Sequence, residues 1–312
     1  MSAPKILSTG RCLPHRIVTN EELSRQVDTN DEWVFSRTGI HQRHFCDGES
    51  GLDLALDSAR QALDRAGLKA EDIGVCLVAT FTPDYASPSM ACLVQKELGL
   101  REDTLCFDLN AACAGFLYGM KTAHALLADS PRPYALLIGC EVISRVLDMT
   151  DRNTCVLFGD GAGAAVLRRD EEASWHTVFG SRGDPESIWV QGPGPEPSAV
   201  HMEGKAVFRF AVEVVEQSIR QMLAEEGCDI NDLDLVVCHQ ANARIIDHVA
   251  KKLKAREGLF YKNMERYGNT SAASIPMALD ELVEQGVLKS GMRVLTVGFG
   301  GGLTWAGALL HW

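Results

Sequence analysis

The 312-residue sequence contains no uninterrupted apolar run of the roughly 18 residues that a membrane-spanning helix requires. It also lacks an excess of basic residues, because 30 Lys and Arg stand against 42 Asp and Glu, for a net charge of −12. A chain with this balance is a poor non-specific ligand for nucleic acid or anionic membranes. The first ten residues do not have the pattern of a secretory signal peptide. We therefore expect a cytoplasmic protein that binds neither nucleic acid nor membranes.

The ten cysteines form no CxxC pair, and none stands near a histidine at zinc-ligand spacing. Disulfides are rare in the cytoplasm, so we expect reduced thiols and no metal site. Cys113 differs from the others because small residues flank it at the start of a predicted helix. The positive end of that helix is expected to lower the pKa of the thiol and stabilise its thiolate. A buried packing cysteine is the alternative.

Apolar runs of strand length alternate with amphipathic segments of helix length, which is typical of an α/β protein. The predicted buried strands are Val75–Thr80, Cys106–Leu109, Tyr134–Ile138, Leu235–Cys238 and Arg293–Val297. The predicted helices are Leu52–Ala66, Ala114–Leu127, Val207–Glu225, Asn242–Lys254 and Ile275–Gln285. The proline-rich segment Gln191–Ser198 is predicted to be a surface connection between two halves of the chain.

Two pairs of segments repeat at nearly the same separation. Gly67–Thr80 (GLKAEDIGVCLVAT) matches Gly227–Gln240 (GCDINDLDLVVCHQ) 160 residues later (227 − 67). Tyr134–Cys140 matches Arg293–Phe299 159 residues later (293 − 134). Helix–strand pairs are common in any α/β protein, but two nearly equal offsets favour a duplicated unit. We predict two halves, 1–170 and 171–312, whose strand ends converge on one site.

Polar residues follow the predicted strands at places where α/β proteins often carry catalytic groups. His239 comes directly after a buried strand, although a lone histidine there is more often structural. Asn269 precedes a predicted helix. Its side chain would either cap that helix or donate an amide hydrogen bond into a cavity. Together with Cys113 they offer a nucleophile, an imidazole and an amide. The glycine-rich runs 159–163 and 298–302 lack the following helix of a dinucleotide site, so we expect close approach of their backbone to a substrate.

Six motifs together resemble the β-ketoacyl-acyl carrier protein synthase III family, from about Pro4 to Trp312. They are DEWVFSRTGI at 31–40, DLNAACAGF at 108–116, FGDGAGAAVL at 158–167, HQAN at 239–242, YGNTSAAS at 267–274 and GFGGGLTW at 298–305. The resemblance implies the thiolase-like fold, with duplicated α/β halves in a layered α-β-α-β-α arrangement. It also implies a homodimer with no cofactor other than the coenzyme A of its substrate.

The resemblance further implies the initiating condensation of type II fatty acid synthesis. An acyl-CoA would acylate Cys113, and malonyl-acyl carrier protein would then give β-ketoacyl-acyl carrier protein, CO2 and CoA. His239 and Asn269 would complete the catalytic set. Elongating synthases carry a second histidine at the place of Asn269, and thiolases carry a late cysteine, whereas none follows Cys238 here.

Further site residues are implied by the same motifs. Gly301 would help to hold the oxyanion, and Phe299 would keep the pocket apolar. Trp33 and Arg37 would sandwich the adenine. The residues implied to bind coenzyme A are Thr29, Trp33, Arg37, Arg152, Gly204, Phe208, Ala241 and Asn242. The residues implied to bind the carrier protein are Gln240, Arg244, Lys251 and Lys254. Ser87 falls where some relatives place a bulky Phe that closes the acyl pocket from the partner subunit, which predicts primers longer than acetyl.

Three alternatives remain open at the level of the sequence. Another thiolase-fold acyltransferase or condensing enzyme of secondary metabolism would carry similar motifs. A cysteine hydrolase is the second, because papain-like enzymes also combine Cys, His and Asn, although their local signature is absent here. The third is a non-catalytic acyl-binding module, against which the intact Cys113 argues.

Overall fold

The computed structural model describes residues 2–192 and 199–312, so most of the predicted connection Gln191–Ser198 lies outside the described residues. The strands are β1 (Ala3–Cys12), β2 (Arg16–Thr19), β3 (Gln42–Phe45), β4 (Ile73–Ala79), β5 (Leu105–Leu109), β6 (Tyr134–Glu141), β7 (Gly161–Asp170), β8 (His176–Asp184), β9 (Ile188–Trp189), β10 (His201–Met202), β11 (Leu235–Cys238), β12 (Arg293–Gly300) and β13 (Gly302–His311). The α-helices are α1 (Asn20–Leu23), α2 (Asp31–Thr38), α3 (Gly51–Ala66), α4 (Met90–Leu98), α5 (Gly115–Leu126), α6 (Gly204–Glu226), α7 (Ala243–Lys252), α8 (Met264–Tyr267) and α9 (Ser274–Glu284). The short 3-10 turns are η1 (Ala70–Asp72), η2 (Ala112–Ala114), η3 (Ile143–Val146), η4 (Ile230–Asp232) and η5 (Ser271–Ala273).

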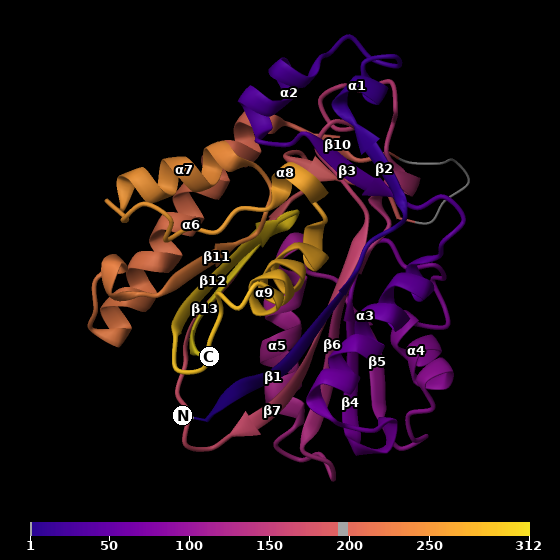
Figure 1. The fold of residues 1–312 in the computed structure, drawn as a ribbon, viewed down its shortest axis with the longest axis vertical. Coiled ribbons are helices and arrows are strands. Elements are labelled where there is room, and N and C mark those ends of the chain that lie inside the picture. Colours follow the sequence, from indigo (N-terminus) through magenta and orange to yellow (C-terminus); the bar gives the residue numbers. More distant parts are fainter. Residues whose placement is uncertain (1, 193–198) are drawn as a thin grey trace.

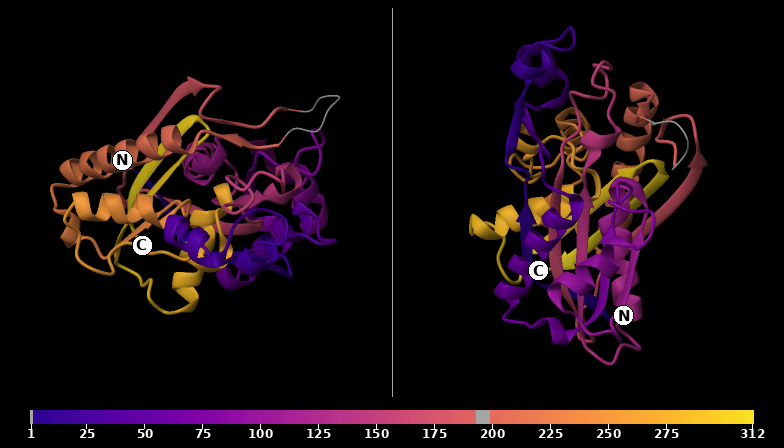
Figure 2. Two further views of the ribbon diagram at one scale, coloured as in Figure 1. Left: turned by 90° about the horizontal axis from the view of Figure 1, so that it is seen from above. Right: turned by 90° about the vertical axis from the view of Figure 1, so that its right-hand side faces the viewer.

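Two sheets alternate with three layers of helices (Figure 1). The five-stranded sheet has the order β1-β7-β6-β4-β5, and the four-stranded sheet has the order β11-β12-β13-β8. Helices α5 and α9 lie between the sheets, α3 and α4 cover the first sheet, and α6 and α7 cover the second. The left view in Figure 2 shows the yellow strands between the orange helices and the magenta α5. This is the layered α-β-α-β-α arrangement that the sequence predicted.

Buried apolar side chains fill the space between the sheets. Phe116 and Met120 of α5 pack there with Leu279 of α9, Leu137 of β6 and Val237 of β11. Most residues of α5 and α9 are buried, because strands or other helices surround these two helices. They therefore form the central layer on which both halves rest.

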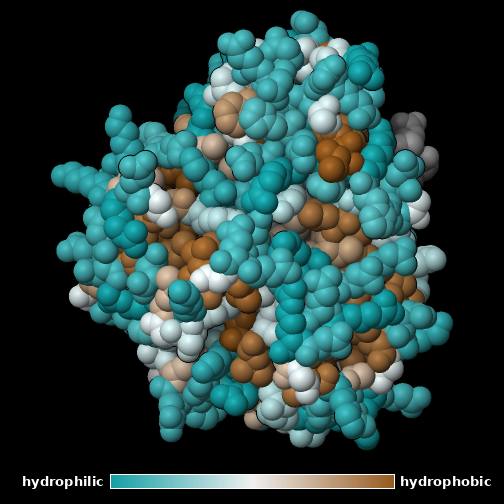
Figure 3. All heavy atoms as spheres, in the orientation of Figure 1, coloured by the Kyte–Doolittle hydropathy of each residue, from teal (hydrophilic) through white to brown (hydrophobic). Residues whose placement is uncertain are grey.

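The face of the molecule in Figure 3 is mainly hydrophilic, with apolar atoms visible in patches between the elements. Within the ranges that the structure describes, no helix combines the length and apolar character needed to cross a membrane.

The two sheets repeat one strand pattern, which confirms the predicted duplication. In the first sheet β4, β6, β7 and β1 pair in the same order and directions as β11, β12, β13 and β8 in the second. The registers agree as well, because Val75 opposes Ala135 and Leu235 opposes Val294, at the offsets found in the sequence. Phe260 takes the place of β5 in the second half through a parallel bridge to β11.

All five predicted strands and all five predicted helices are present, with bounds that differ by a few residues. Helix α6 begins at Gly204, three residues before the predicted start (207 − 204). Helix α7 ends at Lys252 although the apolar pattern continues to Leu253. Lys254 has a φ of 55°, a left-handed conformation that ends an α-helix.

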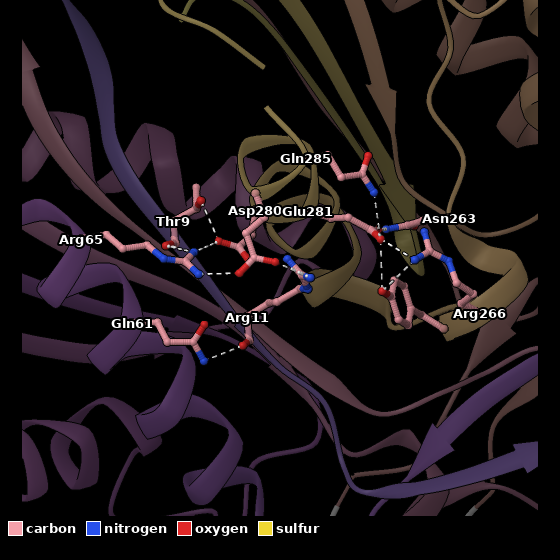
Figure 4. Close-up of polar contacts among 11 residues, drawn as sticks. Thr9, Arg11, Gln61, Arg65, Asn263, Arg266, Asp280, Glu281 and Gln285 are labelled. Carbon is pink, nitrogen blue, oxygen red and sulfur yellow. Dashed lines mark hydrogen bonds and ion pairs between the residues drawn. The ribbon is translucent and has the colours of Figure 1, made fainter. Parts of the chain in front are cut away.

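Helix α9 is tied to the first half by a buried carboxylate (Figure 4). Asp280 is fully buried and accepts hydrogen bonds from Thr9 at 2.8 Å and Arg11 at 2.6 Å, both on β1. It also accepts a hydrogen bond from Arg65 of α3. The next residue ties α9 to the second half. Glu281, 2% exposed, accepts a hydrogen bond from Asn263 at 2.8 Å and pairs with Arg266 at 2.5 Å.

Because a buried charge is costly unless it is paired and hydrogen-bonded, these contacts fix how α9 is rotated between the sheets. This orientation places Ser274, at the start of the helix, beside His239.

Asp280→Asn is expected to lower the free energy of unfolding by about 3 kcal/mol, because Arg11 and Arg65 lose the buried carboxylate between them. Urea unfolding measures the loss. Glu284→Gln is the matched control: Glu284 pairs with the same two arginines, but its side chain is 42% exposed. Its loss is expected to stay below about 1 kcal/mol. Equal losses in the two variants would show that burial of Asp280 does not determine its contribution.

Candidate active site

Cys113 lies in η2, the turn that joins β5 to α5, and its side chain is buried. The turn contains Ala112 at a φ of 46°, and the Asn110 Oδ1 atom accepts a hydrogen bond from the Ala112 N–H at 3.0 Å. Gly300, at the end of β12, lies against the cysteine. A Cβ added at Gly300 would stand 2.7 Å from the Cys113 backbone nitrogen and 3.2 Å from its Sγ. Glycine at this position therefore lets the second half close directly on a thiol of the first.

The thiol does not have the lowered pKa that its place at a helix start predicted. Burial raises the pKa of Cys113 to about 12, and the charge of Glu141 acts in the same direction. A hydrogen bond with Ser271 opposes this shift but does not cancel it. The cost of taking the thiolate out of water exceeds the stabilisation from a helix terminus and one hydroxyl. Cys113 is therefore a protonated thiol whose proton needs an acceptor.

His239 follows β11 and is 1% exposed. Its Nδ1 lies 2.7 Å from Oγ of Ser274, and its ring packs edge-on against Phe299 with centroids 5.2 Å apart. Burial lowers the pKa of the imidazole to about 3, so the ring is neutral. Because Ser274 occupies Nδ1, Nε2 is the nitrogen left for a ligand in the cavity that His239 lines.

Asn269 lies just before η5 and is held through its backbone. Its N–H donates to the carbonyl of Leu157 at 2.8 Å, and its own carbonyl accepts from the N–H of Gly159 at 3.0 Å. Its Oδ1 accepts a hydrogen bond from the Ser271 N–H at 2.9 Å. The amide oxygen is thus occupied, which leaves Nδ2 as a donor for the cavity. Asn110 makes the same turn 159 residues earlier (269 − 110).

Residues far apart in the sequence meet at one narrow cavity of about 120 Å³. The predicted site residues that line it are Cys113, His239, Asn269, Phe299, Gly204, Phe208, Ala241 and Asn242. Three of them, Gly204, Phe208 and Asn242, also line a wider surface cavity of about 980 Å³. The cavity that contains the thiol and the surface cavity are therefore neighbours.

Cys113 also lines a separate cavity of about 370 Å³. The apolar side chains of this second cavity are Phe81, Phe158, Ile188, Trp189, Val190 and Val200. Gly301 lines this cavity and not the narrow one, whereas Gly300 lines the narrow one. The thiol thus stands where two cavities of different character meet.

Two guanidinium groups lie over the ring of Trp33 on α2. The Cζ atoms of Arg37 and Arg152 are 4.6 Å and 5.0 Å from its centroid. Arg152 also donates to the Asp28 carbonyl at 2.8 Å. The Oγ1 atom of the next residue, Thr29, is buried without a hydrogen-bond partner among the described residues. The structure therefore brings together an aromatic plane and two stacking partners of the kind that bind a base.

The prediction that Gln240 contacts a carrier protein is wrong. Gln240 is 1% exposed, and its Nε2 donates to the carbonyls of Cys238 at 2.8 Å and Tyr261 at 3.2 Å. Its Oε1 accepts from the Asn263 N–H at 2.9 Å. The side chain is directed inward and holds the turn that carries His239.

The other predicted docking residues, Arg244, Lys251 and Lys254, are exposed. Arg244 and Lys251 share one face of α7 because they are seven residues apart (251 − 244), whereas Lys254 lies beyond the end of the helix. Lys205 and Arg209 of α6 line the surface cavity together with Arg244. Sequence reasoning did not assign them to docking, although their i, i+4 spacing on one helix was a usable signal.

Ser87 is exposed and lines none of these cavities, so its role at a subunit contact stays a prediction. Sequence reasoning missed three residues around the site. Ser274 is hydrogen-bonded with His239, Ser271 with Asn269, and Glu141 with Ser271. In the described ranges, no three side chains of His, Cys, Asp or Glu are grouped to hold a metal ion.

Comparison with known proteins gives one consistent family. Residues 107–183 match the family model described as 3-oxoacyl-[acyl-carrier-protein (ACP)] synthase III, and residues 223–312 match the model for its C-terminal part. A Clostridium acetobutylicum protein named beta-ketoacyl-[acyl-carrier-protein] synthase III is 42% identical over 100% of this chain and 99% of its own length.

Solved structures agree with this result. The 3-oxoacyl-[acyl-carrier-protein] synthase III of Aquifex aeolicus matches with a TM-score of 0.94 and 38% identity, over 99% of this chain and 100% of that one. The priming beta-ketosynthase of the R1128 polyketide biosynthetic pathway matches with a TM-score of 0.92 and 34% identity, over 99% and 96%.

Gly300→Ala is expected to lower the free energy of unfolding by about 1–3 kcal/mol, because its methyl group overlaps the backbone of Cys113. Urea unfolding gives the value, and mass spectrometry of iodoacetamide-treated protein should show slower alkylation of Cys113. Gly301→Ala is the control for stability, because a Cβ there meets no heavy atom closer than 3.5 Å. A change below about 1 kcal/mol is expected for it. If both variants lose the same stability, the close approach at Gly300 is not the cause.

Proposed function

The chain belongs to the 3-oxoacyl-[acyl-carrier-protein] synthase III family, and we propose that it performs the initiating condensation of fatty acid synthesis with Cys113 as nucleophile. An acyl-CoA and a malonyl-acyl carrier protein react to a β-ketoacyl-acyl carrier protein, CO2 and CoA. One observation carries this proposal: Cys113 from the first half and His239 and Asn269 from the second line a single cavity.

In the first half-reaction the Cys113 thiolate attacks the carbonyl carbon of the acyl-CoA, and the CoA thiolate leaves. The backbone N–H groups of Cys113 and Gly301 are the proposed donors to the oxyanion. Both residues line the cavity of about 370 Å³, which we name the acyl-side cavity because its apolar walls suit a hydrocarbon chain. The acyl chain would occupy that cavity while the narrow one holds the pantetheine arm.

In the second half-reaction His239 Nε2 and Asn269 Nδ2 donate hydrogen bonds to the malonyl thioester oxygen. They stabilise the enolate that forms as CO2 leaves, and its carbon attacks acyl-Cys113. The neutral state of His239 supports this role, because Nε2 carries a proton when the Ser274 hydroxyl donates to Nδ1. Phe299 makes the surroundings apolar, which favours loss of the malonyl carboxylate. The steps use paired electrons throughout and call for neither metal nor redox cofactor.

The protonation states disfavour the alternative of a cysteine hydrolase. Papain-like enzymes depend on a thiolate whose pKa an adjacent imidazolium lowers. Here burial raises the pKa of Cys113 to about 12 and lowers that of His239 to about 3, so the ion pair does not form. A pair of neutral groups fits hydrogen-bond donation to an enolate better.

The entrance to the site supports the proposed substrates. The adenine of coenzyme A would stack on Trp33 beside Arg37 and Arg152, with Thr29 close by. The residues proposed to follow the pantetheine arm are Gly204, Phe208, Ala241 and Asn242. The residues proposed to meet the carrier protein are Arg244, Lys251, Lys254, Lys205 and Arg209. Exposed basic side chains on a protein of net charge −12 provide a local complement to an acidic partner.

A homodimer is the proposed assembly. Strand β5 is an edge of the five-stranded sheet, and Leu105 on it is 43% exposed. An edge strand with an exposed apolar side chain is a surface suited to pairing. In this assembly Ser87 of one subunit would face the acyl-side cavity of the other. The ten cysteines are all free, which supports the proposed location in the reducing cytoplasm.

Cys113→Ala is expected to abolish transfer of radiolabelled acyl groups to the protein while some malonyl-carrier decarboxylation remains. His239→Ala and Asn269→Ala should each slow decarboxylation by about 10²–10³, because each removes one donor to the enolate. Scintillation counting of acyl-protein and of released CO2 measures the two steps. Cys92→Ala, at an exposed thiol on α4, is the control and should acylate normally. Acylation of the Cys113→Ala protein would disprove the assignment of the nucleophile.

Octanoyl-CoA is expected to acylate Cys113 at a rate similar to that of acetyl-CoA. An apolar cavity of about 150 Å³ accommodates benzene, and the acyl-side cavity has about 370 Å³. Ser87→Phe should slow octanoyl transfer selectively if Ser87 of the partner faces this cavity. Single-turnover acylation followed by mass spectrometry compares the two primers. A strict preference for acetyl in the unmodified protein would refute the longer-primer proposal.

A further inference from the structure

Glu141 is a buried acid beside the active-site cysteine that the proposed steps do not use. It ends β6, is 0% exposed, and accepts hydrogen bonds from hydroxyl and backbone N–H groups of the described residues, with no basic side chain among these donors. Its Oε2 accepts hydrogen bonds from the Thr82 hydroxyl at 2.6 Å, from the Thr80 hydroxyl at 3.2 Å and from the Phe81 N–H at 3.2 Å. Neutral donors thus hold a carboxylate where an ordinary core would place an apolar residue.

The second oxygen of this carboxylate is directed toward the cysteine. Glu141 Oε1 accepts a hydrogen bond from the Ser271 hydroxyl at 3.1 Å. The turns η2 and η5 are in contact, and the same hydroxyl lies close enough to the thiol of Cys113 to lower its pKa. Ser271 is fixed in this bridging place, because its φ is 49° and its N–H donates to Asn269 Oδ1. The Ser271 hydroxyl therefore stands between the sulfur and the carboxylate, to which it is hydrogen-bonded.

We propose that Cys113 and Glu141 share one proton through the Ser271 hydroxyl, so that Glu141 is the acceptor for the proton that the thiol must lose. The Cys113 S–H bond breaks as its proton passes to Ser271 Oγ, and the Ser271 O–H bond breaks as its proton passes to Glu141 Oε1. The products are a Cys113 thiolate and a Glu141 carboxylic acid. Ser271 ends as the hydroxyl it was, and the total charge does not change.

The energetics favour Glu141 over the other nearby base. Burial raises the pKa of Glu141 to about 7, whereas it lowers the pKa of His239 to about 3. The carboxylate is therefore the stronger proton acceptor by about four powers of ten. Transfer within the pair also moves an existing negative charge onto sulfur, instead of adding a second charge to a buried site.

Few other ionisable groups face this pair. The Glu141 charge acts on the thiols of Cys113 and Cys140, and burial keeps the pKa of Cys140 well above its ordinary value. The segment Thr80–Thr82 and the turn η5 supply hydroxyl and backbone N–H groups to the carboxylate. His239 stays neutral near pH 7 because burial lowers its pKa to about 3. Burial is the largest cause of both pKa shifts, hydrogen bonds to the carboxylate oppose that of Glu141, and the Glu141 charge adds to that of Cys113.

The test is the pH dependence of Cys113 alkylation by iodoacetamide, with the Cys113 peptide quantified by mass spectrometry. In the unmodified protein the rate should rise tenfold per pH unit up to about pH 7 and then level off. Above this pH the thiol–carboxylate and thiolate–acid forms hold the same number of protons, so their ratio is independent of pH.

Glu141→Gln should remove the plateau. Its rate should match that of the unmodified protein below pH 7 and continue to rise above it. By pH 9 the variant should react roughly a hundredfold faster, because no Glu141 charge opposes formation of the Cys113 thiolate.

Thr80→Val is the matched control, because it removes one hydrogen bond to Glu141 and leaves the bridge to Cys113. The plateau should remain, and its onset should move to higher pH because the carboxylate loses a donor. Circular dichroism establishes that each variant is folded at every pH used. A rate in the unmodified protein that climbs without a break from pH 7 to 9 would overturn the proposal. So would a plateau that persists in Glu141→Gln, or a Glu141→Gln protein that reacts more slowly at every pH.

This inference deepens the proposed role of Cys113 as nucleophile, but the two fail separately. Acylation of Cys113→Ala would refute the nucleophile and leave the alkylation profile as it is. An unbroken profile would refute the shared proton, although Cys113 would still be the residue that becomes acylated.

Discussion

The close packing of two turns, η2 and η5, is the constraint on which the site depends. Each turn joins a strand-side loop to a helix of the central layer, and each contains one residue at positive φ, Ala112 or Ser271. Gly139 of β6 lets η5 lie directly against the first sheet, because a Cβ there would stand 2.3 Å from the Ala272 carbonyl oxygen. Bringing the two turns together places a sulfur from one half beside an amide and a hydroxyl from the other. A small shift between the halves would separate all of them.

Desolvation sets the chemistry of the groups gathered there. It raises the pKa of the Cys113 thiol and of the Glu141 carboxyl and lowers that of the His239 imidazole, so each shift favours the uncharged form. Such a site favours uncharged groups over charged ones. The same property makes a free thiolate expensive, which is why the location of its proton matters.

The sequence predicted the fold well because buried strands carry an unmistakable pattern. Ile73–Ala79 is buried at every position, and its counterpart Leu235–Cys238 repeats that pattern at a constant offset. The position of His239 at the end of a strand and that of Asn269 before a helix indicated a site. Glu141 gave a similar signal at the end of β6, but without its partners it was indistinguishable from an ordinary loop residue.

Other errors share one cause, which is that the neighbours come from distant segments. The family resemblance implied a carrier-protein contact for Gln240, yet its hydrogen-bond partners at Tyr261 and Asn263 lie inside the protein. The helix start at Cys113 was visible locally, whereas the surroundings that exclude water come from residues such as Gly300. Local patterns identify which groups are present, and tertiary packing decides their charge.

The matched turns also bear on how the site acquired its asymmetry. Asn110 and Asn269 make the same hydrogen bond to the residue two positions on, and the residue after the positive-φ position is Cys113 in one copy and Ala272 in the other. In a duplicated chain that began with equivalent copies, each position occurs twice, and the two residues can diverge. One copy carries a reactive side chain, while its twin carries only a methyl group, which lies against Gly115 at the start of the helix that follows the cysteine. The second copy has lost the larger side chain at this position. Its alanine is small enough to pack against the copy that carries the cysteine.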